Sequence, residues 1–415
     1  MPKTVDVKKQ RLRRKIVKNL FFSKELSCNE ISQAIGKSIP LTTQYINEML
    51  ADGMLIERGY ASSTGGRRPL IYSLPGNLFY VISVAMDQLI TRIALISDNN
   101  EYHGDIERYE LSLANNPNAL EELTETLKNF IEKSEVPKDQ IIGIGIGMPG
   151  FVDAKRGVNH SFLQAKSGSI VSLIEKEIGI PVLIDNDSSL IALAELKWGA
   201  AKNKDHVMVI NVGWGVGLGI IADGKLFRGK QGFAGEFSHI PIFNNNKHCS
   251  CGKYGCLETE TSLLFVAQNV IRGIKEGKVS VIQNILEGTV VDAARKIIDA
   301  AHKGDKFSIE ALSESAYNIG RGVAILIHLL NPELIVISGL GSLAGKVWIA
   351  PIQQAINEHC IPKIAENTDI AISTLGYNAE LIGAAALVMD NYDFMKEMSN
   401  DAKSKSKNNT QKFLV

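Results

Sequence analysis

The sequence lacks three features that would place it in other classes of protein. It has no apolar run of about eighteen residues, the length that a membrane-spanning helix needs, and no apolar stretch of a signal peptide near its basic N-terminus. Only five of its 415 residues are cysteines, and Cys28 and Cys360 stand alone. These absences exclude a membrane protein and a disulfide-stapled secreted domain, and they predict a cytoplasmic location.

The sequence also lacks any net charge, but the two signs are unevenly distributed. Residues 1–74 carry thirteen Lys or Arg and six Asp or Glu, a formal charge of +7, and the remaining residues carry −7. A basic head on an acidic body indicates that only the head meets a polyanion. A solvated charged helix would give the same count, so charge alone does not distinguish it from a head that binds a polyanion. The pattern of residues in the head distinguishes the two.

That pattern is typical of a winged helix-turn-helix. A first helix is predicted over Val7–Phe22, a second after the capping pair Ser27 and Glu30, and a third from about Pro40 to Asp52. The third helix should carry short polar side chains opposite its apolar face, where they can meet base edges or phosphates. These candidate DNA-binding residues are Thr42, Thr43, Gln44 and Asn47.

Two predicted strands, Leu55–Tyr60 and Leu70–Leu74, flank a loop that contains two glycines and two arginines. The glycines allow a tight wing tip, and Arg67 and Arg68 place positive charge there for a phosphate backbone or a minor groove. We therefore predict a winged helix-turn-helix DNA-binding domain over residues 1–74, in preference to a head that only dimerises. A linker is predicted at residues 75–78.

The body, from residue 79, alternates apolar strand-like runs with amphipathic helices, which predicts an α/β fold. The strands include Tyr80–Met86, Ile93–Ser97, Ile141–Ile146, Val182–Asp185, Val207–Val212, Val216–Ile221, Leu334–Ser338 and Ile370–Ser373. The helices include Ala119–Lys133, Ser188–Gly199, Val290–His302, Ile309–Leu330 and Ala379–Met389. Strand pairs near residues 80–97 and 207–221 are close enough to form hairpins, and each hairpin can open one lobe.

Three of the five cysteines fall within eight residues, a short distance after a histidine. Three thiolates and one imidazole form a complete tetrahedral zinc set, and a set without an open position is structural. We expect zinc on His239, Cys249, Cys251 and Cys256. The alternative is a group of unliganded thiols near a turn.

The same segment resembles the signature of the ROK family of sugar kinases and sugar-responsive repressors. The resemblance is carried by Glu236 and His239, followed by Cys-x-Cys-Gly-x-x-Gly-Cys-x-Glu over residues 249–258. It extends over nearly the whole chain, including the Gly-Gly-Arg-x-Pro wing. Further matching segments are Gly145-Ile146-Gly147-Met148-Pro149-Gly150, Asp185-Asn186-Asp187, Asn331-Pro332-Glu333 and Gly383-Ala384-Ala385-Ala386.

The resemblance implies a two-lobed actin- and hexokinase-like (ribonuclease-H-like) body. We expect the first lobe at residues 79–187 plus 374–392, and the second lobe, with the zinc motif, at residues 188–373. Residues 393–415 are polar and are expected to be a disordered tail. The implied sugar-binding residues are Asn186, Asp187, Glu236, His239 and Glu258. Asp187 stands where the kinases have their catalytic base, although it can equally cap a helix that starts at Ser188.

The chain differs from the family's kinases in the segments that match their nucleotide-binding loops. The family's kinases carry an Asp-x-Gly-Gly-Thr turn after the first strand, and here the matching residues 85–90 read Ala-Met-Asp-Gln-Leu-Ile. Without glycine, backbone amides cannot curl closely around a phosphate. In the second loop, Gly213–Gly217, the indole of Trp214 replaces a hydroxyl. We therefore predict no enzyme activity, and Asp187 would be vestigial.

Together these features predict a sugar-responsive transcriptional regulator, and the family resemblance implies a repressor similar to those of the N-acetylglucosamine or xylose type. The partners expected are a double-stranded DNA operator and a sugar or sugar phosphate effector. The family resemblance implies a homodimer or homotetramer, and a symmetric dimer would bind two half-sites of DNA. One alternative is a ROK sugar kinase with a fused DNA-binding head. Another is a body that docks another protein and has little affinity for small molecules.

Overall fold

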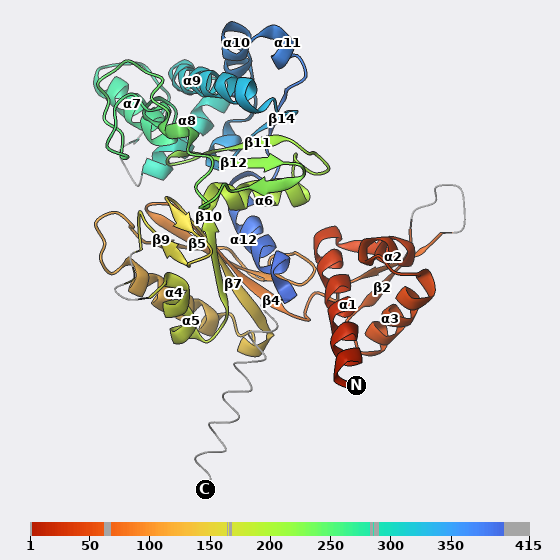
Figure 1. Ribbon diagram of the computed structural model, residues 1–415. Helices are drawn as coiled ribbons and strands as arrows, with labels where there is room; N and C mark the ends of the chain where they lie inside the picture. The colour runs from red at the N-terminus through yellow and green to blue at the C-terminus, as the bar shows by residue number, and fades with distance from the viewer. Residues whose placement is uncertain are drawn as a thin grey trace. The chain divides into compact units, whose positions relative to one another are not determined.

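The computed structural model describes residues 2–61, 68–163, 165, 168–282, 285 and 290–393, without the side chains of residues 2–6, 290 and 291. The chain divides into two compact units (Figure 1). Unit 1 comprises Met1–Gly150, Ala154–Ile184 and Ala384–Val415, and unit 2 comprises Phe151–Asp153 and Asp185–Gly383. This division groups the head with the first lobe, so the predicted boundaries between head, linker and first lobe remain predictions. The predicted tail beyond residue 393 lies outside the described residues.

The head, within unit 1, contains three helices and a three-stranded antiparallel sheet. The helices are α1 (Pro2–Ser23), α2 (Cys28–Ile35) and α3 (Ile39–Ala51), and the strands β1 (Glu25–Ser27), β2 (Ile56–Tyr60) and β3 (Leu70–Ser73) lie in the order β1-β3-β2. The predicted capping box of Ser27 and Glu30 is present at the start of α2, and Gly36 ends this helix with φ of 64°. β1 was not predicted, because three residues carry no periodicity of their own. The wing tip at residues 62–67, with Arg67, lies outside the described residues.

The first lobe, also within unit 1, is built on a five-stranded sheet in the order β10-β7-β4-β5-β6. Its strands are β4 (Tyr80–Met86), β5 (Ile90–Ser97), β6 (Glu107–Glu110), β7 (Ile141–Met148) and β10 (Val182–Asn186). β4, β5 and β6 are antiparallel, and β7 is parallel to β4. β4, β5 and β7 are buried along their whole length, which explains their continuous apolar sequences.

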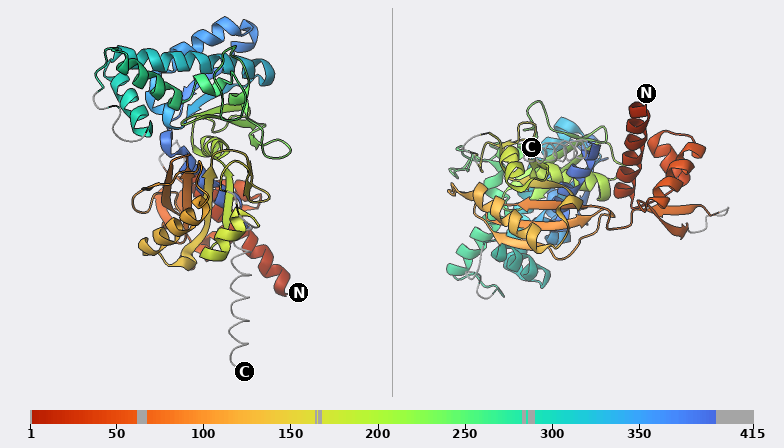
Figure 2. Two further views of the ribbon diagram at one scale, coloured as in Figure 1. Left: turned by 90° about the vertical axis from the view of Figure 1, so that its left-hand side faces the viewer. Right: turned by 90° about the horizontal axis from the view of Figure 1, so that it is seen from below.

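Helices α4 (Ala119–Lys133) and α5 (Ile170–Ile178) pack beside each other in this lobe (Figures 1 and 2). The short elements η1 (Lys138–Gln140) and β9 (Val158–Asn159) complete it. The second half of α12 (Ala379–Asp390) crosses β7 so closely that a Cβ on Gly145 would lie 2.2 Å from the carbonyl oxygen of Ala384. This close approach requires glycine at residue 145.

Unit 2 repeats the plan of the first lobe. Its sheet has the order β13-β12-β11-β14-β15, with antiparallel pairing from β13 to β11 and parallel pairing from β11 to β15. The strands are β11 (Val207–Val212), β12 (Val216–Ala222), β13 (Lys225–Phe227), β14 (Leu334–Ser338) and β15 (Asp369–Ile372). Both predicted hairpins, β4–β5 and β11–β12, are therefore confirmed, and each opens the sheet of one lobe.

Helices and short elements surround the sheet of unit 2, and α9 and α10 run side by side (Figures 1 and 2). Its helices are α6 (Asp187–Trp198), α7 (Leu263–Lys275), α8 (Val290–His302), α9 (Lys306–Leu330), α10 (Ile349–His359), α11 (Pro362–Ala365) and the first half of α12. The short elements are β8 (Val152–Asp153), η2 (Phe237–His239), η3 (Leu257–Glu260), η4 (Leu340–Val347) and η5 (Gly376–Asn378). In the described part of the chain, no helix is both long and apolar enough to cross a membrane.

Candidate functional site

The outer face of α3 carries three of the four polar side chains that were predicted to meet DNA. Thr43, Gln44 and Asn47 are exposed, and the Gln44 side-chain amide donates to a Glu48 carboxylate oxygen at 3.1 Å. The placement of Thr42 on this face was wrong. Thr42 is fully buried, and its hydroxyl donates to the carbonyl oxygen of Ser38 at 3.0 Å. It lies four residues before Ile46, which puts both on the core face of the helix.

The basic residues of α1 are partly engaged inside the head, which the charge count did not reveal. Lys9 pairs with Glu48 of α3 at 2.7 Å, and Arg13 pairs with Asp52 just beyond it. These contacts fix α3 against α1. Arg68, beside the wing, is exposed. Lys9 and Arg13 are therefore not free to contact a polyanion, although the net charge of the head is unchanged.

A second feature of unit 1 is the contact between α1 and the end of α12. The Lys18 ammonium donates to the carbonyl oxygen of Asp390 at 2.8 Å and lies 3.2 Å from its carboxylate. The Arg14 guanidinium donates to the carbonyl oxygen of Asp393 at 3.4 Å. Cations are favourable at a helix C-terminus, where carbonyl groups are unpaired and the helix dipole is negative. The head is thereby attached to the last turn of α12.

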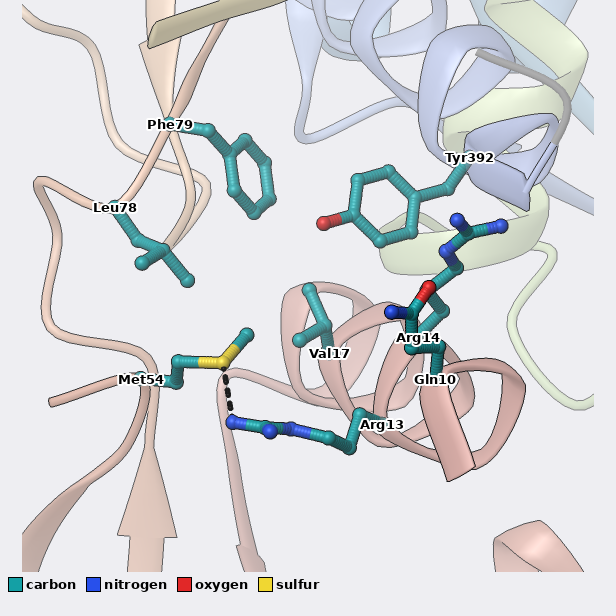
Figure 3. Close-up of a pocket in the computed structure, with 8 residues that line it drawn as sticks. All are labelled: Gln10, Arg13, Arg14, Val17, Met54, Leu78, Phe79 and Tyr392. Carbon is teal, nitrogen blue, oxygen red and sulfur yellow. Dashed lines mark hydrogen bonds between the residues drawn. The ribbon is translucent and has the colours of Figure 1, made fainter. Parts of the chain in front are cut away.

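A cavity of about 300 Å³ lies beside this contact (Figure 3). The rings of Phe79 and Tyr392, which line it, stack against each other with centroids 5.5 Å apart, and Arg13 donates to the Met54 sulfur at 2.9 Å. Burial raises the pKa of the Tyr392 hydroxyl. The residues lining the cavity are Gln10, Arg13, Arg14, Val17, Met54, Leu78, Phe79 and Tyr392. The sequence carries no signal for this joint, because its residues come from distant parts of the chain.

The carboxylate of Asp98 holds the segment between head and body. It is fully buried and accepts the backbone N–H groups of Gly76 at 2.6 Å and Leu78 at 2.8 Å. Burial raises the pKa of Asp98 from its ordinary 3.8 to about 6. The unfolded chain therefore releases this proton at lower pH than the folded chain, so the contribution of Asp98 to stability falls as pH rises from about 4 to about 6.

This linkage predicts a pH-dependent effect of Asp98→Asn, whose side chain does not titrate. The free energy of unfolding of the variant, relative to that of the wild type, should rise by about 1 kcal/mol from pH 5 to pH 7. The loss of one hydrogen bond should lower it by the same amount at both pH values. Melting temperatures of both proteins at the two pH values measure this change. Glu110→Gln, at an exposed carboxylate of the same lobe, controls for the loss of one charge. An equal difference in melting temperature at both pH values would contradict the prediction.

The predicted metal ligands of unit 2 form one cluster. The ligand atoms of His239, Cys249, Cys251 and Cys256 all lie within 4.8 Å of one another. His239 Nδ1 is 3.5 Å from the Cys249 sulfur, and the sulfurs of Cys251 and Cys256 are 3.6 Å apart. Zinc–sulfur bonds of about 2.3 Å in a tetrahedron place two sulfurs about 3.8 Å apart, so this spacing fits a metal.

The loop around this cluster is shaped by backbone hydrogen bonds and two glycines. Cys249 N–H donates to the Lys253 carbonyl at 2.8 Å, and Gly252 N–H donates to the Cys249 carbonyl at 2.9 Å. A Cβ on Gly255 would lie 2.0 Å from the carbonyl oxygen of Phe243, so this position excludes larger residues. Burial, with the neighbouring thiols, raises the pKa of Cys256 to about 12. A cation is needed to hold the Cys256 sulfur as a thiolate.

The predicted sugar contacts lie next to the metal cluster. Asn186 caps α6 by accepting the N–H groups of Ser188 at 3.0 Å and Ser189 at 3.2 Å. The helix therefore begins at Asp187, and the cap is Asn186, not Asp187 as the alternative interpretation had it. One Asp187 oxygen accepts from Ser188 N–H at 2.7 Å, and the other lies 3.3 Å from the donating amide of Asn211.

The carboxylates of this polar cluster influence one another. Removal of water raises the pKa of Asp187 to about 6, and the negative charge of Glu236 contributes to the rise. Burial raises the pKa of Glu236 as well, opposed by His239, whose Nε2 lies 3.8 Å away. Glu258 accepts the N–H of Val216 at 3.3 Å. The arrangement offers several acceptors, with the Asn186 amide beside them, which suits the hydroxyls of a polyol.

An ion pair that the sequence pattern does not indicate supports this cluster. The Arg228 guanidinium donates twice to one oxygen of buried Asp185, at 2.6 and 3.0 Å. The other oxygen of Asp185 accepts the N–H of Asn186 at 2.9 Å. Arg228 thus compensates a buried charge directly before the Asn186–Asp187 turn. A single arginine after a short strand carries no sequence signal that could have indicated this pairing.

The two loops that match the phosphate loops of the kinases are each engaged within their own unit. One Asp87 carboxylate oxygen accepts the N–H groups of Leu89 at 2.8 Å and Ile90 at 2.7 Å, which closes the β4–β5 turn. In unit 2, a Cβ on Gly215 would lie 2.6 Å from Glu258, and one on Gly217 would lie 2.0 Å from the Ser188 hydroxyl. Close packing alone is therefore enough to require these two glycines.

The model of the ROK family matches residues 89–391. A xylose repressor from Caldicellulosiruptor bescii is 30% identical over 90% of this chain and 94% of its own length. A glucokinase from Halalkalibacterium halodurans is 34% identical, over 63% of this chain and 80% of its own length. A solved ROK family transcriptional regulator, a homologue of the Escherichia coli Mlc protein, is 24% identical with a TM-score of 0.71, covering 94% of this chain and 96% of its own.

Proposed function

Because the chain belongs to the ROK family, we propose that it is a sugar-responsive DNA-binding transcriptional regulator that acts as a repressor. The observation that carries this function is the extent of the matches. The repressor match covers 90% of the chain, whereas the glucokinase match covers 63%. A match of 90% cannot leave out the whole of residues 1–74, the segment in which the helix-turn-helix lies.

The head binds the operator through α3 and the wing. Thr43, Gln44 and Asn47 face the solvent on α3 and meet base edges, and Arg67 and Arg68 contact phosphates or the minor groove. A symmetric homodimer or homotetramer presents paired heads to half-sites separated by whole turns of DNA.

The body binds the effector, a sugar or sugar phosphate. Asn186, Asp187, Glu236, His239 and Glu258 provide its acceptors and donors. One zinc ion on His239, Cys249, Cys251 and Cys256 orders the loop that carries Glu258. His239 is common to both sets, because Nδ1 faces Cys249 and Nε2 faces Glu236.

The body no longer works as a kinase. Phosphoryl transfer requires backbone N–H groups around the phosphates. The N–H groups of Leu89 and Ile90 instead donate to Asp87, and that carboxylate would repel an anion. The rival function is a ROK kinase with a fused DNA-binding head. The hydrogen bonds of Leu89 and Ile90 to Asp87 argue against it, because these N–H groups are not available to a phosphate.

The effector acts on DNA binding through α12. Residues 379–383 of this helix belong to unit 2 and residues 384–390 to unit 1, so the helix connects the sugar-binding unit to the contacts of Lys18 and Arg14. A change in unit 2 on sugar binding reaches α1 through this continuous element.

Asp187→Asn tests the effector site and the missing enzyme activity together. The variant replaces one acceptor oxygen of the carboxylate with an amide donor, so its affinity for the sugar should fall roughly tenfold or more. Sugars that raise the melting temperature of the wild type should therefore raise that of the variant by a smaller amount. Sugar-dependent ATP consumption should be absent from both proteins. Asp205→Asn, an exposed change in the same unit, is the control. ATP consumption by the wild type that disappears in Asp187→Asn would establish the kinase instead.

A further inference from the structure

The loop over residues 228–236 is attached to the polar cluster at both ends. It begins at Arg228, which pairs with Asp185, and it ends at Glu236, whose charge acts on Asp187. Ala234 N–H donates to the Arg228 carbonyl at 3.1 Å and closes the loop. Gly235 has φ of 107°, and a Cβ there would lie 2.3 Å from the Leu218 carbonyl oxygen. Both ends of the loop are therefore fixed at the sugar-binding cluster, and Phe233 precedes Glu236 by three positions.

Phe233 lies in this loop and forms a pair with Phe151. The two rings meet edge to face, with centroids 5.7 Å apart, and both residues belong to unit 2. The segment that follows Phe151 also packs along the loop, because a Cβ on Gly232 would lie 3.4 Å from the Val152 carbonyl oxygen. Phe151 remains 39% exposed and Phe233 is half-buried, so neither ring is part of the core.

Aromatic rings and carboxylates recognise different parts of a carbohydrate. Carboxylate and amide groups bind hydroxyls, whereas an aromatic face packs against the C–H groups of a pyranose ring. The polar cluster provides enough groups for the hydroxyls of one ring. The cluster also contains three carboxylates, Asp187, Glu236 and Glu258, whose negative charges repel an anionic ligand nearby. An exposed aromatic pair beside such a cluster suits a second, uncharged ring.

We propose that Phe151 and Phe233 form a stacking platform for the second ring of a neutral disaccharide or glycoside, which is the effector of this protein. The proposal rests on the proposed function and makes its effector more specific. Phe151, the more exposed of the two rings, provides the stacking face, and Phe233 supports its orientation through the edge-to-face contact.

Isothermal titration of the full chain with matched sugars tests the platform. The pairs are glucose with cellobiose and with maltose, xylose with xylobiose, and N-acetylglucosamine with chitobiose; glucose 6-phosphate is the anionic probe. In at least one pair, the disaccharide should bind about tenfold more tightly than its monosaccharide, and more tightly than the sugar phosphate. Phe151→Ala should abolish this gain and leave monosaccharide affinity within about twofold. Phe151→Trp should retain the gain.

Phe227→Ala is the matched control, because this phenylalanine is 53% exposed in the same unit and lies on β13. Its affinities should equal those of the wild type. Monosaccharide binding without any gain from a second ring, or an equal loss for both sugars in Phe151→Ala, would overturn the platform and leave the proposed function intact. Tighter binding of glucose 6-phosphate than of every neutral sugar would overturn the neutral effector. Failure of every sugar to bind would overturn the platform and the sugar-responsive function together.

Discussion

Serine in place of Cys256 is expected to abolish stable zinc binding and to unfold the segment between His239 and Glu258. Cys256 is fully buried, and its sulfur is 3.6 Å from that of Cys251. A structural zinc set with one ligand removed loses most of a binding free energy that is on the order of 10 kcal/mol, because folding of the loop and metal binding are one process. Elemental analysis should give about one zinc per wild-type chain and far less in the variant, with a lower melting temperature.

Two comparisons separate the metal from general effects of losing a thiol. Cys28→Ser, at a partly exposed cysteine of the head, should retain zinc and melting temperature. Removal of zinc from the wild type by a chelator should reproduce the loss of sugar binding in Cys256→Ser, because Glu258 follows the last ligand by two residues. A Cys256→Ser protein with full zinc content and an unchanged sugar response would disprove the assignment.

Replacement of Arg67 and Arg68 by alanine is expected to weaken operator binding by roughly tenfold or more at moderate salt. Each arginine that neutralises a phosphate releases a counterion, so the slope of log affinity against log salt should become less negative by about 1 to 2. Fluorescence anisotropy with labelled operator at several salt concentrations measures both quantities. Asn47→Ala should instead change the preference among operator sequences with little effect on the slope.

The body provides a matched control for the loss of two positive charges. Lys303 and Lys306 are exposed in unit 2, and their double replacement by alanine should leave DNA affinity and its salt dependence unchanged. Equal affinity of the wild type and the arginine double variant at every salt concentration would exclude a role of the wing in DNA binding.

Sequence by itself determined the features that depend on neighbouring residues. The capping box joins Ser27 and Glu30, which are three positions apart, and the hairpins β4–β5 and β11–β12 join strands that follow each other directly. Such contacts form over short loops, so the local pattern of residue types is enough to predict them. Clustering of the three cysteines within eight residues likewise indicated that His239, Cys249, Cys251 and Cys256 would meet, as they do.

Tertiary structure alone decided which polar groups are already engaged by partners far along the chain. Thr42 is buried against the core, and Lys9 and Arg13 bind acidic groups at the end of α3 instead of remaining available to DNA. Arg228 meets Asp185 across 43 positions, and Lys18 meets the end of α12 across 372. Residue type shows that a side chain is charged or aromatic. Its partner depends on how the whole chain packs, because a buried charge is stable only where the fold brings a compensating group to it.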